Sequence, residues 1–267
     1  MFGKLLKAEW RASRRVIGIL CLAVLIAALV LGAVGCGLFL SEAHNRTFRE
    51  PVNLAVGLVS VAALMVIEVA WAASIFYALW RFYRSRFTEE GYLTWTLPVG
   101  GHSLLLSAIL ASVLEILLVG LATAASGALG LGVCALGIPW REAPADFWLQ
   151  IRQGLTELWH RLTPYGGVIA EAALTAALLL LSQLIQLMLS VTIGAMAAKK
   201  HPILMAILVY HGIGFVKTAV YLTVFVGGNA MLSELSVMGT SDLLSVLTIL
   251  GGYFAMYFLT VKKLNLN

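Results

Sequence analysis

The sequence predicts an all-α membrane protein with six transmembrane helices, and three observations lead to this prediction. The chain is 61% apolar and only 12% charged, whereas soluble domains are roughly half apolar and about one quarter charged. Its apolar residues gather into six long segments, and a helix needs about 20 such residues to span a bilayer. Lys and Arg collect beside the ends of these segments, as is typical of membrane proteins. All 267 residues are therefore expected to form a single transmembrane domain.

The six apolar segments are separated by short polar stretches. They cover residues 17–40, 54–79, 104–136, 165–197, 203–226 and 243–260. The third and fourth segments are longer than a bilayer requires, so we expect them to be tilted, broken or extended beyond it. Ahead of the first segment, residues 1–16 alternate apolar and basic side chains in a pattern typical of a helix on the membrane surface. We expect a basic interfacial helix there, on the cytoplasmic side.

The distribution of basic residues predicts the orientation of the chain. Twelve Lys and Arg residues precede the first segment or lie in 81–86, 199–200 and 262–263, which alternate topology places on one side. Five lie on the other side, and the last loop there, 227–242, has none. Because cytoplasmic loops carry the excess of Lys and Arg, both termini are predicted to be cytoplasmic.

The longest loop on the outer side, residues 138–164, contains a second amphipathic pattern. Phe147, Ile151, Leu155 and Leu162 recur at helical spacing among charged residues, and Trp140, Trp148 and Trp159 fit the aromatic enrichment of membrane interfaces. We therefore expect an amphipathic helix that lies on the outer leaflet.

The predicted cytoplasmic loop 81–103, between the second and third segments, has the most distinctive pattern in the chain. It reads RFYRSRFTEEGYLTWTLPVGGHS. Thr88 followed by Glu89 and Glu90 resembles a helix N-cap with acidic residues in the first turn, and Gly91 is a position at which such a helix breaks or bends. The residues alone leave two interpretations open. One is a short helix with an apolar surface for a partner, and the other is an interfacial turn anchored by aromatic side chains.

Within this loop, residues 87–99 read FTEEGYLTWTLPV, which resembles the F-x-(D/E)-E-G-Y-L-T-x-T-L-P-V stretch of ABC-2 type transporter permeases. The plan of six spans with both ends inside is also similar to that of this family. The resemblance implies a type V exporter-like permease that dimerises with a second copy or a homologue and sits on two ABC ATPase subunits, which bind ATP and Mg²⁺. It also implies that loop 81–103 is the coupling helix that contacts the ATPase. The carried-over residues are Glu89, Glu90, Gly91, Tyr92, Leu93, Thr94, Thr96, Leu97 and Pro98; Trp95 falls at a variable position and is given no role.

Polar residues inside the apolar segments form a second candidate set. At about 1.5 Å per residue, Glu68, Glu115 and Lys217 lie roughly 16 to 21 Å from the cytoplasmic ends of their segments, so they share one level. A charge at that depth costs a few kcal/mol or more unless it faces a partner or water. We predict that one carboxylate pairs with Lys217, either as a structural pair or as part of a transport path.

Uncharged polar and small residues inside the segments predict contacts between helices. Gln183, Gln186 and His211 either line a cavity or, as we favour, hydrogen-bond neighbouring helices. Small residues at four-residue steps, Ala28, Gly32 and Cys36, permit close helix packing.

Several classes of function are not supported by the sequence. No phosphate-binding loop ending in Gly-Lys-Ser or Gly-Lys-Thr occurs, the five histidines lack the HExxH spacing of metalloproteases, and no Arg follows Glu89-Glu90 in the register of membrane-embedded proteases. The three cysteines lie in or beside apolar segments without ligand spacing. We therefore predict no catalytic residue, metal site or cofactor in this chain, and no binding to nucleic acid.

These observations lead to one expected function and two alternatives. We expect the membrane-spanning subunit of an ATP-driven exporter in a bacterial plasma membrane, which moves an amphipathic substrate such as a drug, an antimicrobial peptide or a lipid-like molecule. The alternatives are a scaffold or sensor that transports nothing, and an ion channel lined by Glu68, Glu115 and Lys217. The sequence leaves the substrate and the direction of transport open.

Overall fold

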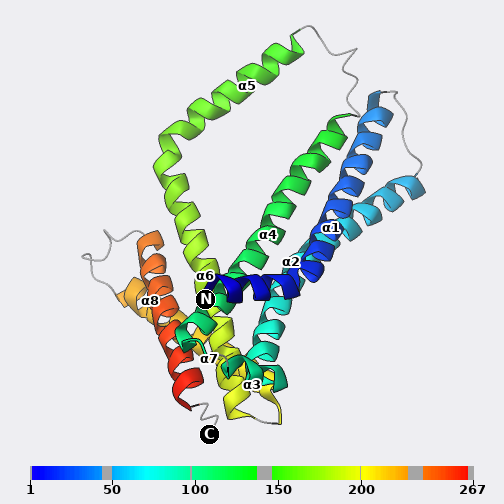
Figure 1. The fold of residues 1–267 in the computed structure, drawn as a ribbon. Coiled ribbons are helices and arrows are strands. Elements are labelled where there is room, and N and C mark those ends of the chain that lie inside the picture. Colours follow the sequence, from blue (N-terminus) through cyan, green and yellow to red (C-terminus); the bar gives the residue numbers. More distant parts are fainter. Residues whose placement is uncertain are drawn as a thin grey trace. The chain divides into compact units, whose positions relative to one another are not determined.

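The computed structural model describes residues 2–43, 50–96, 98–136, 146–198, 200–227 and 237–263, and all regular secondary structure in these ranges is helical (Figure 1). Six helices are long and apolar enough to cross a membrane, as the sequence predicts. These candidate spans are Phe2–Leu38, Val52–Phe87, Gly101–Ala135, Arg152–Ala197, Pro202–Thr223 and Ser241–Val261. Large apolar side chains such as Leu22, Leu121 and Phe215 are exposed on them, which suits a helix surface that lies in lipid.

The chain forms two compact units, and helices α2 (Glu50–Phe87), α4 (Gly101–Ala135) and α5 (Phe147–Leu162) contribute to both. The first unit comprises Met1–Ala78 and Leu110–Gln153, and the second comprises Leu79–Ile109 and Gly154–Asn267.

In the first unit, α1 (Phe2–Ala43) packs closely against the last turns of α4. A Cβ built on Gly130 would lie 2.7 Å from the carbonyl oxygen of Ala28, and one built on Gly32 would collide with the carbonyl oxygen of Gly130. Small residues thus allow the two backbones to meet, as is common between membrane helices. The small-residue pattern predicted from Ala28 and Gly32 therefore marks a contact within one chain.

The predicted interfacial helix at residues 1–16 is continuous with the first span, because α1 runs without interruption from Phe2 to Ala43. Figure 1 shows that α1 changes direction near its start. Ser13 lies in this early part, is fully buried, and donates its hydroxyl back to the carbonyl of Trp10 (3.2 Å). Back-bonding of this kind often bends helices, so residues 2–16 can follow the membrane surface while the rest of α1 crosses it.

In the second unit, α6 (Gly166–Ala197) packs against both α7 (Pro202–Gly227) and α8 (Val237–Tyr257). Four residues connect α6 to α7, so the two helices are antiparallel neighbours. Gly194 sets their approach, because a Cβ there would lie 2.6 Å from the carbonyl oxygen of Pro202 and 2.9 Å from the Cα of Ala206. The short helix η2 (Phe258–Lys263) continues α8 as a π-helix.

Helix α5 (Phe147–Leu162) lies within the predicted outer loop 138–164, and the 3₁₀ turn η1 (Thr163–Tyr165) joins it to α6. Its apolar side chains Leu155 and Trp159 are 62% and 71% exposed, while Glu157 and Arg161 form an ion pair along the polar face (2.5 Å). Such a surface suits a membrane interface. Residues 137–145, with Trp140, and the side chain of Trp148 lie outside the part of the chain that the structure describes.

Replacement of Gly194 by Ala is expected to lower stability by roughly 1–3 kcal/mol, because its Cβ would overlap rigid backbone of α7. The matched control is Gly212→Ala in α7, where a Cβ meets nothing within 4 Å, and where Ala is favoured over Gly by about 0.5–1 kcal/mol in a helix. Thermal unfolding of the purified protein in detergent compares the two variants. Equal melting temperatures would contradict the α6–α7 contact.

Candidate functional site

A short helix, α3 (Glu89–Trp95), follows the end of α2 directly and precedes the start of α4. Of the two interpretations that the sequence leaves open for this loop, the structure shows the short helix, which begins after Thr88. The side chain of Thr88 acts differently from a helix cap, because its hydroxyl donates backwards to the carbonyl of Arg84 (2.6 Å). The backbone carbonyl of Thr88 accepts from Gly91 N (2.8 Å) and starts the new helix. Thr88 therefore hydrogen-bonds to α2 through its side chain and to α3 through its backbone carbonyl.

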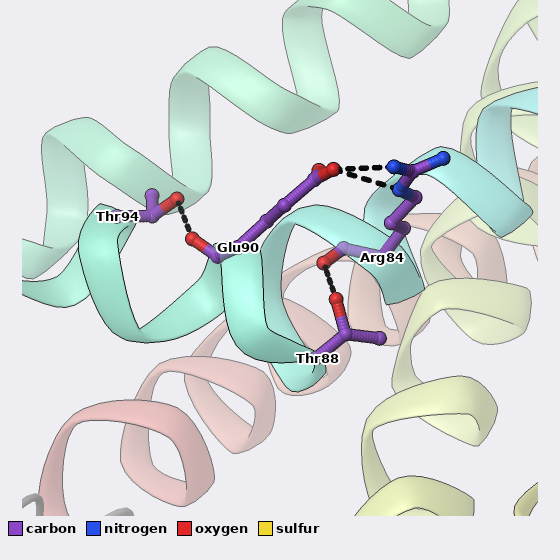
Figure 2. A network of polar contacts seen from close by, with 4 residues as sticks. All are labelled: Arg84, Thr88, Glu90 and Thr94. Carbon is purple, nitrogen blue, oxygen red and sulfur yellow. Dashed lines mark hydrogen bonds and ion pairs between the residues drawn. The ribbon is translucent and has the colours of Figure 1, made fainter.

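An ion pair fixes the first turn of α3 to the last turns of α2. Arg84 reaches the Glu90 carboxylate through Nη2 (2.6 Å) and Nε (2.8 Å), as Figure 2 shows. The guanidinium carbon of Arg84 also lies 5.3 Å from the centre of the Trp80 ring, and Thr94 donates its hydroxyl to the carbonyl of Glu90 (2.9 Å). Both charged side chains are about half exposed. The pair therefore orients α3 and stabilises it by less than about 1 kcal/mol.

Gly91 allows α3 to lie directly on the end of α2. It is buried, and a Cβ at this position would collide with the carbonyl group of Arg86. Helix α3 runs through Gly91 without a break, so a helix break at this residue is excluded. The glycine serves close backbone approach between two helices.

Arg86 connects the ends of α2, α3 and α4. Its side chain is buried, with 2% of the residue exposed, and its Nη2 donates to the carbonyl of Leu104 in α4 (2.7 Å). Its guanidinium carbon lies 6.0 Å from the centre of the Trp95 ring in α3, and the Nε1 of Trp95 donates to the carbonyl of Arg86 (3.2 Å). Arg86 therefore holds three helix ends in one place.

Neither Arg86 nor Trp95 was selected from the sequence. Arg86 was counted among the basic residues that set topology, and Trp95 fell at a variable position of the resemblance. Their spacing of nine residues does not indicate a contact, because the contact depends on the turn of the chain at Thr88.

The other residues carried over from the resemblance divide by exposure. Glu89, Thr96 and Pro98 are exposed, and Thr94 is half-buried. Leu97 and the side chains of Tyr92 and Leu93 lie outside the described residues. Of these exposed residues, Glu89 lies in the first turn of α3, whereas Thr96 and Pro98 follow its end.

The start of α4 packs against the end of α8 next to this site. The His102 ring stacks on Tyr257 with ring centres 3.6 Å apart and planes within 10°, and its Nδ1 lies 2.9 Å from the hydroxyl of Tyr253. These contacts join α4 to α8, although His102 and Tyr253 are 151 positions apart in the sequence. The second unit thus forms a continuous chain of contacts from α3 through α4 to α8.

A second polar cluster joins α6 and α7. Lys217 donates to Oε1 of Gln186 (3.1 Å), and Nε2 of Gln186 donates to the carbonyl of Tyr210 (3.2 Å). The hydroxyl of Tyr210 donates to Oε1 of Gln183 (3.2 Å). Gln186 is 2% exposed, Lys217 and Tyr210 are half-buried, and Gln183 is exposed. Both predicted glutamines therefore hydrogen-bond the neighbouring helix.

The remaining predicted polar residues are Glu68, Glu115 and His211. Glu68 is exposed and Glu115 is buried, with 1% exposed, and both belong to the first unit. Lys217 belongs to the second unit, so its pairing with a carboxylate stays a prediction. His211 is exposed and its ring lies edge-on to that of Tyr210 (5.4 Å).

Within the described ranges, no group of three or more His, Cys, Asp or Glu residues is arranged to hold a metal ion. Cys21, Cys36 and Cys134 are free thiols. Comparison of the chain with protein-family models, with curated proteins and with solved structures finds no match.

Replacement of Arg86 by Met is expected to destabilise the protein by roughly 2 kcal/mol or more, because a charged hydrogen bond inside the protein is lost. The matched control, Arg84→Met, removes an arginine whose ion pair is half exposed and is expected to cost less than about 1 kcal/mol. Thermal unfolding in detergent measures both. Equal losses would mean that Arg86 does not connect the helix ends.

Replacement of Gly91 by Ala is expected to displace α3 from the end of α2, because the added methyl group collides with backbone. Gly127→Ala in α4, where a Cβ meets nothing within 4 Å, is the control. Limited proteolysis at residues 87–99 measures the displacement, and faster cleavage is expected in the Gly91 variant alone. Unchanged cleavage would show that α3 does not depend on this contact.

Proposed function

We propose that this chain is the membrane-spanning permease subunit of an ATP-driven exporter of the ABC-2 type. The observation that carries the proposal is the FTEEGYLTWTLPV stretch, whose acidic and glycine residues lie on a separate short helix between two candidate spans. A coupling helix requires such a position, because it must contact a soluble ATPase and pass a displacement to membrane helices.

The contacts of α3 suit the transmission of a displacement. Gly91 and Glu90 fix α3 to the end of α2, and Arg86 links both to the carbonyl of Leu104 at the start of α4. His102, two residues before Leu104, continues the connection to α8 through Tyr257. A displacement of α3 is therefore expected to move the end of α2, the start of α4 and α8 together, because packed helices shift as rigid elements. The proposed mechanism is conformational and includes no covalent chemistry in this chain.

In the proposed assembly, two permease chains sit on two ATPase subunits that bind ATP and Mg²⁺, within a bacterial plasma membrane. The exposed apolar face of α5, with Leu155 and Trp159, supports a position at the outer leaflet. That position favours export of an amphipathic molecule such as a drug, an antimicrobial peptide or a lipid-like compound.

Glu89→Lys reverses a charge on the exposed face of α3, and we expect it to abolish the association with an ATPase without unfolding the permease. The tagged protein is purified from its native membrane in mild detergent, and the co-purified material is assayed for ATP hydrolysis and sequenced for a phosphate-binding loop. Glu157→Lys in α5, also exposed, is the matched control on the opposite side and should keep the partner.

Three outcomes separate the alternatives. An ATPase that co-purifies with wild type and the Glu157 variant, and not with the Glu89 variant, supports the proposal. A partner that binds α3 and hydrolyses no ATP would identify a scaffold or sensor instead. Ion current through the reconstituted chain alone, without ATP, would identify a channel.

A further inference from the structure

The amide group of Gln186 is held in one orientation by its two partners. A backbone carbonyl only accepts hydrogen bonds, so the Gln186 atom that faces the Tyr210 carbonyl must be Nε2. Its Oε1 is therefore turned toward the ammonium group of Lys217. Because Gln186 is 2% exposed, this arrangement is fixed inside the α6–α7 contact.

Lys217 is directed toward the middle of the membrane by this bond. At about 1.5 Å per residue, Lys217 lies roughly 22 Å and Gln186 roughly 16 Å from the connected ends of α7 and α6. Side chains on a helix lean toward its N-terminus, which in α7 is the end at Pro202. Lys217 therefore points away from the outer end of α7 and toward Gln186, whereas a lysine that avoids the membrane would extend to the nearer interface.

The partner of Lys217 leaves its charge uncompensated within the second unit. Among the described residues of that unit, the ammonium group has one hydrogen-bond acceptor, the neutral amide oxygen of Gln186. An ammonium group has three N–H donors. Lys217 is half-buried, and a Cβ built on Gly214, one turn before it, would be in ordinary van der Waals contact with Nε2 of Gln186 at 3.7 Å.

A further donor lies one turn away on α6. Gln183 is exposed, and its Oε1 already accepts from the Tyr210 hydroxyl, which leaves its Nε2 group as a donor. Gln183 lies one turn farther from the α6–α7 connection than Gln186, the residue that binds the Lys217 ammonium group. The cluster thus combines one positive charge and two kinds of N–H donor in an apolar setting, where such groups require an acceptor.

We propose that Lys217, Gln186 and Gln183 form an intramembrane site for the anionic group, phosphate or carboxylate, of an amphiphile whose apolar chain lies in the bilayer. Lys217 supplies the charge, Gln186 positions the ammonium group, and Gln183 donates a second hydrogen bond. In an exporter this site receives the anionic group of the transported molecule, and that extension alone rests on the proposed function. The competing explanation is the pair predicted from the sequence, in which Glu68 or Glu115 neutralises Lys217.

The test measures binding to the purified permease alone, so it is independent of any ATPase partner. Native mass spectrometry counts dodecyl phosphate retained by the protein, beside dodecylphosphocholine, which has the same chain and phosphate with an added positive group. Phosphatidylglycerol and phosphatidylcholine provide the two-chain pair. We expect wild type to retain one anionic molecule, and Lys217→Met to bind it about tenfold more weakly or worse, because a charge-assisted hydrogen bond is lost.

Three further variants keep the test decisive. Lys200→Met makes the same charge change at an exposed position before α7 and should bind as wild type does, while Lys217→Arg should retain most of the affinity. If Lys217→Met is not monodisperse in detergent, Gln183→Leu replaces it, and a several-fold loss of affinity is expected with the lysine intact.

The outcomes decide between the two explanations. Equal binding by wild type and Lys217→Met, or equal losses in the Lys217 and Lys200 variants, would overturn the proposal. Binding that appears only after Glu68→Gln or Glu115→Gln would overturn it in favour of the internal ion pair. Selective retention of phosphatidylglycerol supports the site with a resident lipid as ligand, and selective retention of dodecyl phosphate supports it with a single-chain, transported type of ligand.

Discussion

The buried guanidinium group of Arg86 is the constraint on which the rest of the candidate coupling site depends. A buried charge without acceptors is costly, so the chain must bring acceptors to it. The carbonyl of Leu104 lies 2.7 Å from Nη2, and the face of the Trp95 ring lies close to the guanidinium group. To supply these groups, α3 must turn back over the end of α2, and Gly91 makes that turn possible because no side chain separates the two backbones. The position of α3 is therefore determined by the groups that must surround the buried guanidinium group of Arg86.

The same contacts link the short helix α3 mechanically to the longer helices α2 and α4. Seven residues are too few to form a stable helix alone, so α3 exists because it is fixed at both of its ends. Glu90 is bound to Arg84 and Trp95 to Arg86. Helix α4 is in turn held to α8 by the stacking of His102 on Tyr257. A partner that displaces α3 would therefore act on the end of α2, on the start of α4 and, through α4, on α8.

Much of the fold was predictable from the sequence, because long apolar segments and flanking charges require only local information. The six spans, the helix after Thr88 and the amphipathic α5 all follow from such patterns. The roles of Arg86 and Gly91 did not, since both arise from a contact between helix ends that depends on the path of the chain. Gln186 was predicted as a polar residue in a span, yet its orientation toward Lys217 requires the register of α6 against α7. The sequence alone therefore locates polar residues by depth and leaves their partners open.

The two charged clusters differ in a way that bears on function. Arg84 and Glu90 neutralise each other at an exposed position, where water and salt reduce the value of the pair. Lys217 lies in a span, and its acceptor in the second unit is an uncharged amide. A structural role would favour a carboxylate as the partner, because the apolar surroundings strengthen attraction between opposite charges. The amide of Gln186 orients the ammonium group without neutralising it, so within the second unit this contact does not supply the opposite charge that a structural ion pair would supply.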